Sequence, residues 1–277
     1  MLDRHREPNV RVMFELLTAQ TSNRLAGLLL RIRPAPLAQF LKRALRVRRQ
    51  TVETKSGRFW LDPATLIGRE IIETGVFEPQ MIANLERWLS PGSVFVDLGA
   101  NEGYFTVLGA KLVGPSGRVI AIEPQERLAG VIEENLRLNG LQNVAVERAA
   151  VSNKSGKATL HLAPDTNTGS SGFINVARYS LPTQVVGLKT LAQVLDDHGL
   201  GRVDLLKVDI EGAEWEAILG SPEVFGSRRV KVLALELHPI QLAKSGRSGG
   251  DIEEFLTSAG YRHSRNSGTD VWIAPDL

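Results

Sequence analysis

The chain has 277 residues, no cysteine, and a composition of 43% hydrophobic and 23% charged residues. This composition is typical of a globular protein and excludes disordered, collagen-like and membrane-bundle classes. The lack of cysteine excludes disulfide scaffolds, thiol catalysis and cysteine-ligated metal sites. The start MLDRHREPNV has no apolar run, and no stretch approaches about 18 apolar residues. We therefore expect a cytoplasmic protein with neither a cleaved signal peptide nor a membrane span.

The net charge of +2 conceals two regions of opposite sign. Residues 1–58 hold 13 Lys and Arg against 4 Asp and Glu, whereas the rest of the chain holds 20 against 27. A basic block of this kind is typical of a surface that meets an anionic partner. We predict a basic helical extension over residues 1–50, a hairpin and helix lead-in over 51–92, and a larger domain over 93–277.

The clearest helix of the extension begins at about residue 37. Its apolar residues recur at helical spacing, and basic residues occupy the other side. The apolar positions are Leu37, Phe40, Leu41, Ala44 and Leu45, and the basic ones are Lys42, Arg43, Arg46, Arg48 and Arg49. Two interpretations are open: the apolar face packs on the body or on a second subunit, or the helix lies on a membrane or an acidic partner. We favour packing.

Beyond residue 50 the chain alternates strands and helices. Residues 51–62 predict a hairpin around Ser56-Gly57, and a helix begins at about Pro79 and ends before Pro91. The strands are expected at 94–97, 118–123, 144–151, 203–210, 230–237, 261–264 and 270–274. The helices between them are expected at 104–113, 124–140, 190–198, 212–220 and 251–259. Residues 157–162 predict a local antiparallel excursion, and residues 163–182 a polar loop that could cover a site. This alternation predicts an α/β fold with a mainly parallel sheet and helices on both faces.

The turn after the first of these strands, DLGANEG at residues 97–103, is rich in glycine. Glycine lets the backbone turn sharply and lets a ligand approach the main chain. Glu123 ends the strand that follows, the usual place for a carboxylate that holds ribose hydroxyls, which indicates a nucleoside-type cofactor. A dinucleotide site has glycine where Asp97 stands, because an aspartate repels pyrophosphate. An aspartate attracts the amino group and sulfonium of S-adenosylmethionine, so the pattern favours that cofactor.

Several segments together resemble one known family. VFVDLGANEGYFT, with IEP, ENLRLNG, AAVSN, LLKVDIEGAE and LELH further along, resembles the FkbM family of S-adenosylmethionine-dependent methyltransferases from about residue 75 onward. The resemblance implies the Rossmann-like class I methyltransferase fold, with a mainly parallel seven-stranded sheet whose last strand is antiparallel. By match to the family motif, the residues implied around the methionine part are Asp97, Gly99, Asn101 and Gly103. It also implies Glu123 at the ribose and Ala150 beside the adenine.

The acceptor is expected beyond the carboxyl ends of the fourth and fifth parallel strands. Asp209 and Glu211 follow the fourth strand, and Glu236 and His238 end the fifth. A hydroxyl acceptor loses its proton to a histidine or carboxylate within hydrogen-bond reach. We therefore predict Asp209, Glu211 and His238 as catalytic residues. Structural alternatives stay open, since Glu211 would stabilise a helix N-terminus and His238 would cap a strand end.

A metal site is a further alternative for these residues. Carboxylates at the same strand ends hold Mg²⁺ in catechol-type O-methyltransferases, where the ion orients the hydroxyl and lowers its pKa. Those enzymes have a D-x-D-like or D-N pair, which this sequence lacks. We expect no metal.

The function that follows is methyl transfer from S-adenosylmethionine to a hydroxyl of a sugar or of a glycosylated or polyketide-like metabolite, with a small-molecule or glycan acceptor. One alternative is an RNA methyltransferase. Against it, the Asn-Pro-Pro-aromatic motif of amine methylation is absent, and the basic segment has only Phe14 and Phe40 for base stacking, so we expect no nucleic acid. Another alternative is a non-catalytic cofactor-binding protein of the same fold. Contact of residues 1–50 with a membrane surface, and the oligomeric state, are open.

Overall fold

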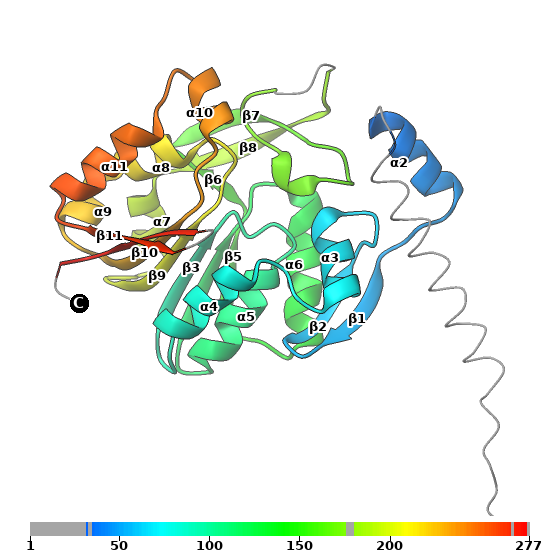
Figure 1. Cartoon of the computed structure of the whole chain (residues 1–277), viewed down its shortest axis with the longest axis horizontal. Helices are drawn as coiled ribbons and strands as arrows, with labels where there is room; N and C mark the ends of the chain where they lie inside the picture. Colours follow the sequence, from blue (N-terminus) through cyan, green and yellow to red (C-terminus); the bar gives the residue numbers. More distant parts are fainter. Residues whose placement is uncertain (1–31, 33–34, 176–179, 267–268, 276–277) are drawn as a thin grey trace, which may run out of the picture.

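A seven-stranded sheet runs through the centre of the molecule (Figure 1). The computed structural model describes residues 32, 35–175, 180–266 and 269–275. Across the sheet the strand order is β11-β12-β10-β9-β3-β4-β5. The strands are β3 (Val94–Leu98), β4 (Arg118–Ile122), β5 (Val144–Glu147), β9 (Val203–Val208), β10 (Val230–Leu235), β11 (Arg262–Asn266) and β12 (Thr269–Ile273). The five strands from β10 to β5 are parallel, and β12 is antiparallel to both of its neighbours. The predicted α/β class I sheet with an antiparallel last strand is therefore confirmed.

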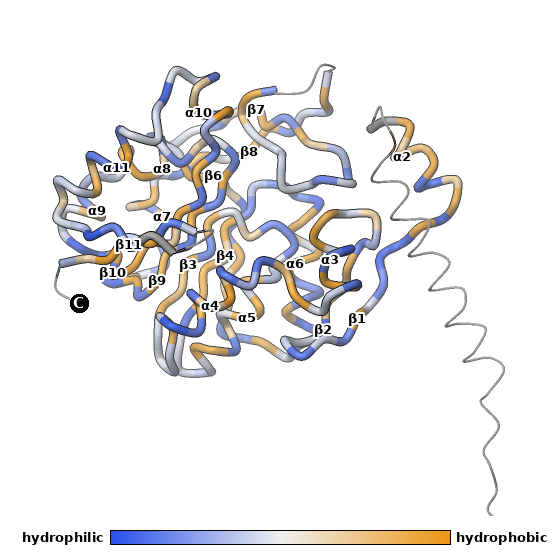
Figure 2. The backbone as a smooth tube through the Cα atoms, viewed as in Figure 1, coloured by the Kyte–Doolittle hydropathy of each residue, from blue (hydrophilic) through white to orange (hydrophobic). Residues whose placement is uncertain are grey.

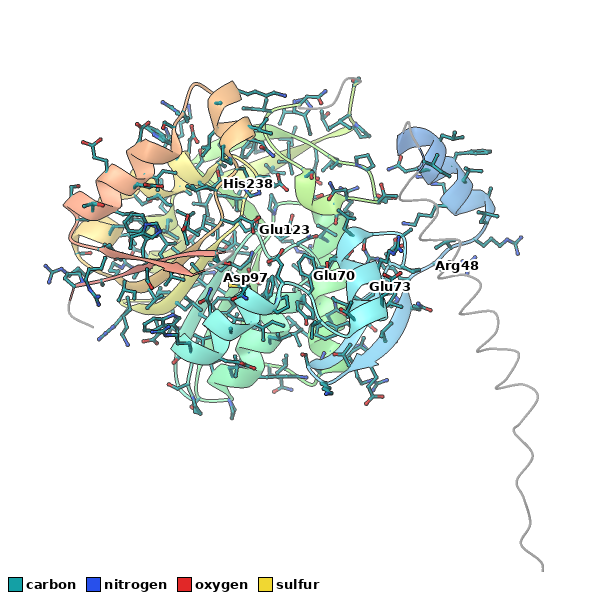
Figure 3. All side chains as sticks on the ribbon, viewed as in Figure 1. Arg48, Glu70, Glu73, Asp97, Glu123 and His238 are labelled. Atoms are coloured by element: carbon teal, nitrogen blue, oxygen red, sulfur yellow. The ribbon has the colours of Figure 1, made fainter. Side chains whose placement is uncertain are left out.

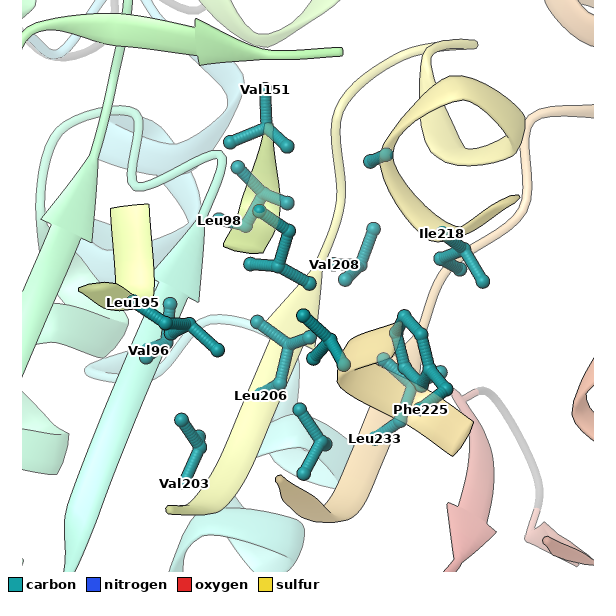
Figure 4. Close-up of a cluster of buried hydrophobic side chains, with 14 of the residues drawn as sticks. Val96, Leu98, Val151, Leu195, Val203, Leu206, Val208, Ile218, Phe225 and Leu233 are labelled. Atoms are coloured by element: carbon teal, nitrogen blue, oxygen red, sulfur yellow. The ribbon is translucent and has the colours of Figure 1, made fainter. Parts of the chain in front are cut away.

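Helices cover both faces of this sheet. One face carries α4 (Pro79–Trp88), α5 (Tyr104–Val113) and α6 (Glu126–Leu138), and the other carries α7 (Leu191–Asp197), α8 (Glu214–Leu219), α9 (Pro222–Gly226) and α11 (Gly249–Ser258). Successive side chains of a strand point to opposite faces, so each strand supplies both cores. In β3, Phe95 packs with α4 and α5, whereas Val96 and Leu98 pack in the cluster of Figure 4. Strands buried on both faces are apolar throughout, so their apolar runs predict them in the sequence.

The N-terminal elements lie at the β5 side of the sheet (Figure 1). The predicted hairpin is confirmed: β1 (Gln50–Thr54) pairs antiparallel with β2 (Gly57–Leu61). The short helix α3 (Leu66–Thr74) was not expected from the sequence. It begins where the Thr65 hydroxyl accepts a hydrogen bond from Gly68 N, and it ends at Gly75, whose φ of 83° needs a glycine-like backbone.

Helix α2 (Ala35–Ala44) precedes the hairpin, and its contacts correct the expected packing on the body, whereas packing on a second subunit stays a prediction. Ala38 is buried, and Leu41 packs partly with Val47, Ile32 and Ala64. Leu37, Phe40 and Leu45 are exposed instead of packed. The apolar stripe of α2 is wider than the surface it contacts, so only one side of it is covered. The predicted helices before residue 32 lie outside the described residues.

The predicted strand at 144–151 is interrupted at Arg148. β5 stays in the central sheet, whereas β6 (Ala149–Val151) joins a small sheet of order β6-β8-β7. There β7 (Gly156–His161) runs antiparallel to β8 (Thr183–Lys189), so the antiparallel excursion is confirmed, while β8 was not expected. Arg148, between the two strands, is exposed and its guanidinium pairs with Glu133.

Two strands end earlier than predicted, and this places polar residues in loops. β9 ends at Val208 and β10 at Leu235, so Asp209 and Glu236 begin the segments beyond the sheet. The short helix α10 (Pro239–Lys244) follows directly after His238. Among the described helices, none combines the length and the apolar character that crossing a bilayer requires. Figure 2 shows the hydrophobic residues along the central strands, with polar residues on the loops at their ends.

Candidate active site

A cavity of about 350 Å³ lies beyond the carboxyl ends of β3, β4, β9 and β10. This is the edge at which open parallel sheets bind their ligands. Figure 3 shows Glu123 and His238 on this side of the molecule. Of the residues predicted for the site, the lining includes Gly99, Asn101, Glu123, Ala150, Asp209, Glu211 and His238. Asp97 and Gly103 are not part of the lining.

The glycine-rich turn brings β3 against the end of β9. Gly99 has a φ of 86°, and a Cβ there would lie 1.8 Å from the carbonyl oxygen of Asp209. No other residue fits this approach without moving the backbone. Asn101, two residues on, also has a positive φ of 50°. Its side-chain oxygen accepts a hydrogen bond from Thr168 Oγ1 at 3.0 Å. The turn therefore joins the cofactor side of the cavity to the loop that covers it.

Glu123 is a buried carboxylate on the cavity wall. Its two oxygens accept hydrogen bonds from the backbone N–H groups of Asn101 (2.9 Å) and Gln125 (3.0 Å). Burial raises the pKa of Glu123 to about 7, against the lowering effect of these two bonds. A charged carboxylate with few partners in a cavity gains from hydroxyl donors. This arrangement suits the two vicinal hydroxyls of a ribose.

Asp97 lies behind the turn. Thr106 Oγ1 donates to one carboxylate oxygen of Asp97 at 2.6 Å, and Lys207 Nζ lies 3.3 Å from the other. Asp97 is fully buried, and Gly103 packs against Ile132 at the start of α5. The structure thus places both residues in support of the turn. Their direct contact with the methionine part stays a prediction.

The expected covering loop contributes to the cavity wall through its 3₁₀ turn at Thr168–Ser170 and the residues around it. Together with Arg127 and Asn101, Gln125 holds this loop in place. Its amide nitrogen donates to Thr168 O (3.2 Å), and its amide oxygen accepts from Ser171 Oγ (2.9 Å). Ala150 lies in β6, with Ala149 and Val151, on the same wall. These short side chains leave room for a flat ring such as adenine.

The acceptor side is built around His238. Its Nδ1 lies 2.7 Å from Glu214 Oε1, and Glu214 is fully buried. Because Nδ1 donates to that carboxylate, Nε2 is the nitrogen that faces the cavity. Nε2 lies 3.7 Å from both Asp209 Oδ1 and Glu211 Oε2. The three predicted catalytic residues are therefore brought together.

The charges around His238 determine its protonation. Burial by itself would lower the pKa of His238, but the hydrogen bond with Glu214 and the negative charge of Glu211 outweigh it. The result is a pKa of about 9. Glu211, with a φ of 51°, accepts a hydrogen bond from Gln241 Nε2 at 2.8 Å, and burial raises its pKa. The strained backbone of Glu211 is thus held by a contact from α10.

Two residues of the site were missed in the sequence analysis. Glu78 lines the cavity in the positive-φ region, and burial, together with Glu236 and Asp209, raises its pKa to about 7. Lys207 is 2% exposed and lies between Asp97 and Asp209, 3.4 Å from Asp209 Oδ2. Lys207 stands in LLKVDIEGAE, which carries the family resemblance, but a charged residue in an apolar strand shows no partner in the sequence. Glu78 directly precedes the helix that begins at Pro79, where the sequence does not indicate a role for it.

Strands β9 and β10 also gather three possible metal ligands. One ligand atom each from Asp209, Glu236 and His238 lies within 4.8 Å of the others. The sequence raises a metal alternative for the residues at these strand ends, but it does not show that these three meet, because Asp209 follows β9 whereas Glu236 and His238 follow β10. The ammonium of Lys207 already accompanies Asp209 there. The expectation that no metal binds stays a prediction.

The profile of the methyltransferase FkbM domain matches residues 97–263, more than half of the chain. The chain belongs to the FkbM methyltransferase family. The family expected from the sequence is thus confirmed, and with it an S-adenosylmethionine-dependent methyltransferase activity. A second profile, of protein-L-isoaspartate(D-aspartate) O-methyltransferase, matches residues 39–153.

Individual relatives share the methyltransferase name. Methyltransferase sdnD of Sordaria araneosa is 32% identical over 190 residues, which cover 58% of this chain and 70% of sdnD. The 31-O-demethyl-FK506 methyltransferase FkbM of Streptomyces tacrolimicus is 30% identical over 204 residues, 62% of this chain and 74% of its own length. Among solved structures, a SAM-dependent methyltransferase from Aquifex aeolicus has a TM-score of 0.44 at 20% identity, covering 75% of this chain and 94% of its own.

The residues of this FkbM-family cavity fit S-adenosylmethionine. Glu123 offers the buried carboxylate that ribose hydroxyls require, and Ala149, Ala150 and Val151 of β6 line the cavity with short apolar residues beside which adenine fits. The Gly99 turn presents main chain, with no side chain in the way, where the methionine part would lie. The acidic residues that line the cavity beyond this turn attract the positive sulfonium and ammonium groups of S-adenosylmethionine.

Proposed function

We propose that this enzyme transfers the methyl group of S-adenosylmethionine to a hydroxyl of a sugar, or of a glycosylated or polyketide-like metabolite. The observation that carries the proposal is the His238–Glu214 pair, in which Nδ1 is held by the buried Glu214 while His238 lines the cavity that Glu123 also lines. A histidine held by a buried carboxylate, with its other nitrogen open, is the arrangement of a general base. A hydroxyl needs such a base, because its proton has to leave as the oxygen is methylated.

His238 is the residue that receives the proton. When bound, S-adenosylmethionine supplies an activated methyl group: the acceptor oxygen forms the new O–C bond, the C–S bond breaks, and a methyl ether and S-adenosylhomocysteine result. The hydroxyl proton passes to His238 Nε2. Glu214 keeps the ring in the required orientation through Nδ1 at 2.7 Å. Asp209 and Glu211, each 3.7 Å from Nε2, stabilise the imidazolium that forms.

The carboxylates on the acceptor side of the cavity favour a substrate with several hydroxyl groups. Glu78, Asp209, Glu211 and Glu236 all line the cavity. An ionised carboxylate only accepts hydrogen bonds, so this wall suits an acceptor with several hydroxyl donors, as a sugar ring has. The name of the Streptomyces tacrolimicus relative, a 31-O-demethyl-FK506 methyltransferase, supports O-methylation of a polyketide-like compound. The cytoplasm is the proposed compartment, because the reaction needs a supply of S-adenosylmethionine.

A product assay tests the proposal. Purified enzyme is incubated with isotopically methyl-labelled S-adenosylmethionine and a panel of sugars, glycosides, macrolide alcohols and matched amines, and mass spectrometry locates the label. We expect label on oxygen of a hydroxyl acceptor, and its loss in His238→Gln, which keeps the size but not the basicity. Label only on nitrogen would overturn O-methylation. Cofactor binding without transfer to any acceptor would favour the non-catalytic alternative.

A further inference from the structure

The outer side of α2 and the turn after it form an apolar patch that no described residue covers. Leu37 is 45% exposed, Phe40 66% and Leu45 48%. Exposed residues of this size are normal when single, but here three lie within nine residues, two on α2 and one directly after it. Figure 2 shows α2 as a largely hydrophobic segment at the edge of the molecule, away from the central sheet. We call Leu37, Phe40 and Leu45 the α2 patch.

The basic residues beside the α2 patch divide into two groups. Lys42 forms an ion pair with Asp62, and both guanidinium NH groups of Arg49 bond to the buried Glu102. These two hold the segment to the body and are not free for a partner. Arg43, Arg46 and Arg48 are exposed, and no ion pair joins them to another described residue. Figure 3 shows Arg48 on the outer edge of the molecule.

Helix α2 and the turn after it nevertheless pack against the body at one place, around Ala64. Ala38 (1% exposed) and Val47 (6%) pack against the body, where Val47 meets Ala64. The next two residues along the chain, Thr65 and Leu66, line the cavity, and Leu66 is itself 55% exposed. Ala64, which Val47 contacts, is therefore next in sequence to two residues of the cavity wall.

We propose that the α2 patch, with Arg43, Arg46 and Arg48, docks on an anionic lipid surface. A short helix with an exposed apolar edge and cationic neighbours is the pattern of interfacial membrane binding. The apolar side chains enter the boundary between headgroups and acyl chains, and the arginines pair with anionic headgroups. An RNA partner would use the arginines but leave Leu37 and Leu45 in water. This proposal goes beyond the methylation and does not rest on its acceptor.

Vesicle sedimentation of the full chain tests it. We expect binding to vesicles mixed from two parts phosphatidylcholine and one part phosphatidylglycerol, weak binding to phosphatidylcholine alone, and a steep loss with added salt. Each arginine near an anionic surface contributes about fivefold, the equivalent of about 1 kcal/mol. The triple variant Arg43→Gln, Arg46→Gln and Arg48→Gln should therefore bind about 100-fold more weakly. Leu37→Ser with Phe40→Ser should lose binding while keeping its charge.

A matched control separates the patch from general surface hydrophobicity. Val185→Ser removes another exposed apolar residue, 66% exposed on β8, and should bind vesicles as the parent does. Every variant should keep the parent's melting temperature and affinity for S-adenosylmethionine. No sedimentation of the intact chain would overturn the proposal, as would equal binding to both vesicle types. So would a concentration-dependent dimer that the patch variants dissolve, or RNA binding that only the arginine variant loses.

Discussion

Lys207 and Asp97 form a buried ion pair in which Lys207 Nζ lies 3.3 Å from Asp97 Oδ1, with side chains that are 2% and 0% exposed. Lys207 also donates to Gly99 O at 3.1 Å and lies 3.4 Å from Asp209. Burial by itself would lower the pKa of Lys207, but the charges of Asp209 and Asp97 outweigh it and keep the lysine protonated. One ammonium therefore links the cofactor turn after β3 to the acceptor loop after β9.

Replacing Lys207 should lower both the free energy of unfolding and the affinity for S-adenosylmethionine. Lys207→Met leaves Asp97 as an unpaired buried charge, so we expect the free energy of unfolding to fall by about 3–5 kcal/mol. The double change Lys207→Met with Asp97→Asn removes both charges and should recover part of the loss. Urea denaturation of the parent and the two variants measures the free energy of unfolding. Equal destabilisation by the single and double changes would contradict the pairing.

Glu123 is predicted to hold the ribose. Charge-assisted hydrogen bonds are worth about 1.5–3 kcal/mol each. Glu123→Ala should therefore weaken S-adenosylmethionine binding by about 2–4 kcal/mol, roughly 30- to 1000-fold. Because the pKa of Glu123 is about 7, affinity should also fall as pH drops below 7, when the carboxyl takes up a proton. Glu123→Gln should bind weakly with no such pH dependence. Calorimetry showing unchanged affinity would remove Glu123 from the cofactor site.

His238 sets the expected pH profile of the reaction. A general base acts in its unprotonated form, and the pKa of His238 is about 9. At pH values below 9, kcat/KM should therefore rise about tenfold per pH unit and level off above 9. Glu214→Gln replaces the charged partner by a neutral one, so the inflection should move toward the ordinary histidine pKa of about 6.5. An inflection that stays near 9 in Glu214→Gln would exclude this role for the pair.

The raised pKa of His238 also makes the stability of the fold depend on pH. The folded-state pKa of His238 lies above its unfolded value, so protonated His238 stabilises the fold fully below about pH 6.5. That contribution is lost as pH rises through about 9. Melting temperatures measured from pH 6 to 10 should fall over this interval in the parent and less in His238→Gln. A parallel fall in both proteins would show that another group is responsible.

Metal removal should have little effect on the enzyme. Lys207 supplies a positive charge beside Asp209, where a divalent ion would otherwise be needed. We expect EDTA to leave the methylation rate within twofold, and Asp209→Asn to lower turnover while cofactor affinity changes only a few-fold. Calorimetry with Mg²⁺ or Mn²⁺ gives a readout independent of activity. Micromolar binding that Glu236→Gln abolishes, together with metal-restored turnover, would establish a metal site of Asp209, Glu236 and His238.

Arg49 and Glu102 join the basic extension to the cofactor turn. Two N–H groups of Arg49 bond to the two oxygens of Glu102, at 3.0 and 2.9 Å, and Glu102 is fully buried. Arg49→Ala would leave that carboxylate without a cation, so we expect a loss of about 3–5 kcal/mol in unfolding free energy. Arg48→Ala, at the exposed neighbouring position, is the matched control and should change stability by at most about 0.5 kcal/mol. Similar losses in both variants would contradict the role of the pair.

The sequence by itself determined the order of the central strands along the chain and the cofactor turn. Both depend on neighbouring residues: an apolar run predicts a strand buried on two faces, and glycine in residues 97–103 marks a turn that other residues cannot make. The short elements α3 and β8 were not predicted, because each contains a glycine, Gly68 and Gly187, which is unfavourable inside a helix or a strand. The single predicted strand at 144–151 is divided at Arg148, because residues 144–147 pair with β4 whereas residues 149–151 pair with β8.

Only the tertiary structure decided which charged residues meet. Glu214 and His238 are 24 residues apart in the chain, and Lys207 of β9 meets Asp97 of β3. A buried charge is stable only with its partner, yet the partner lies on a neighbouring strand and leaves no periodic signal in the chain. Likewise, the spacing of Leu37 and Phe40 predicts an amphipathic helix but not which side of it is covered. That depends on the width of the surface around Ala64, which exists only once the chain has folded.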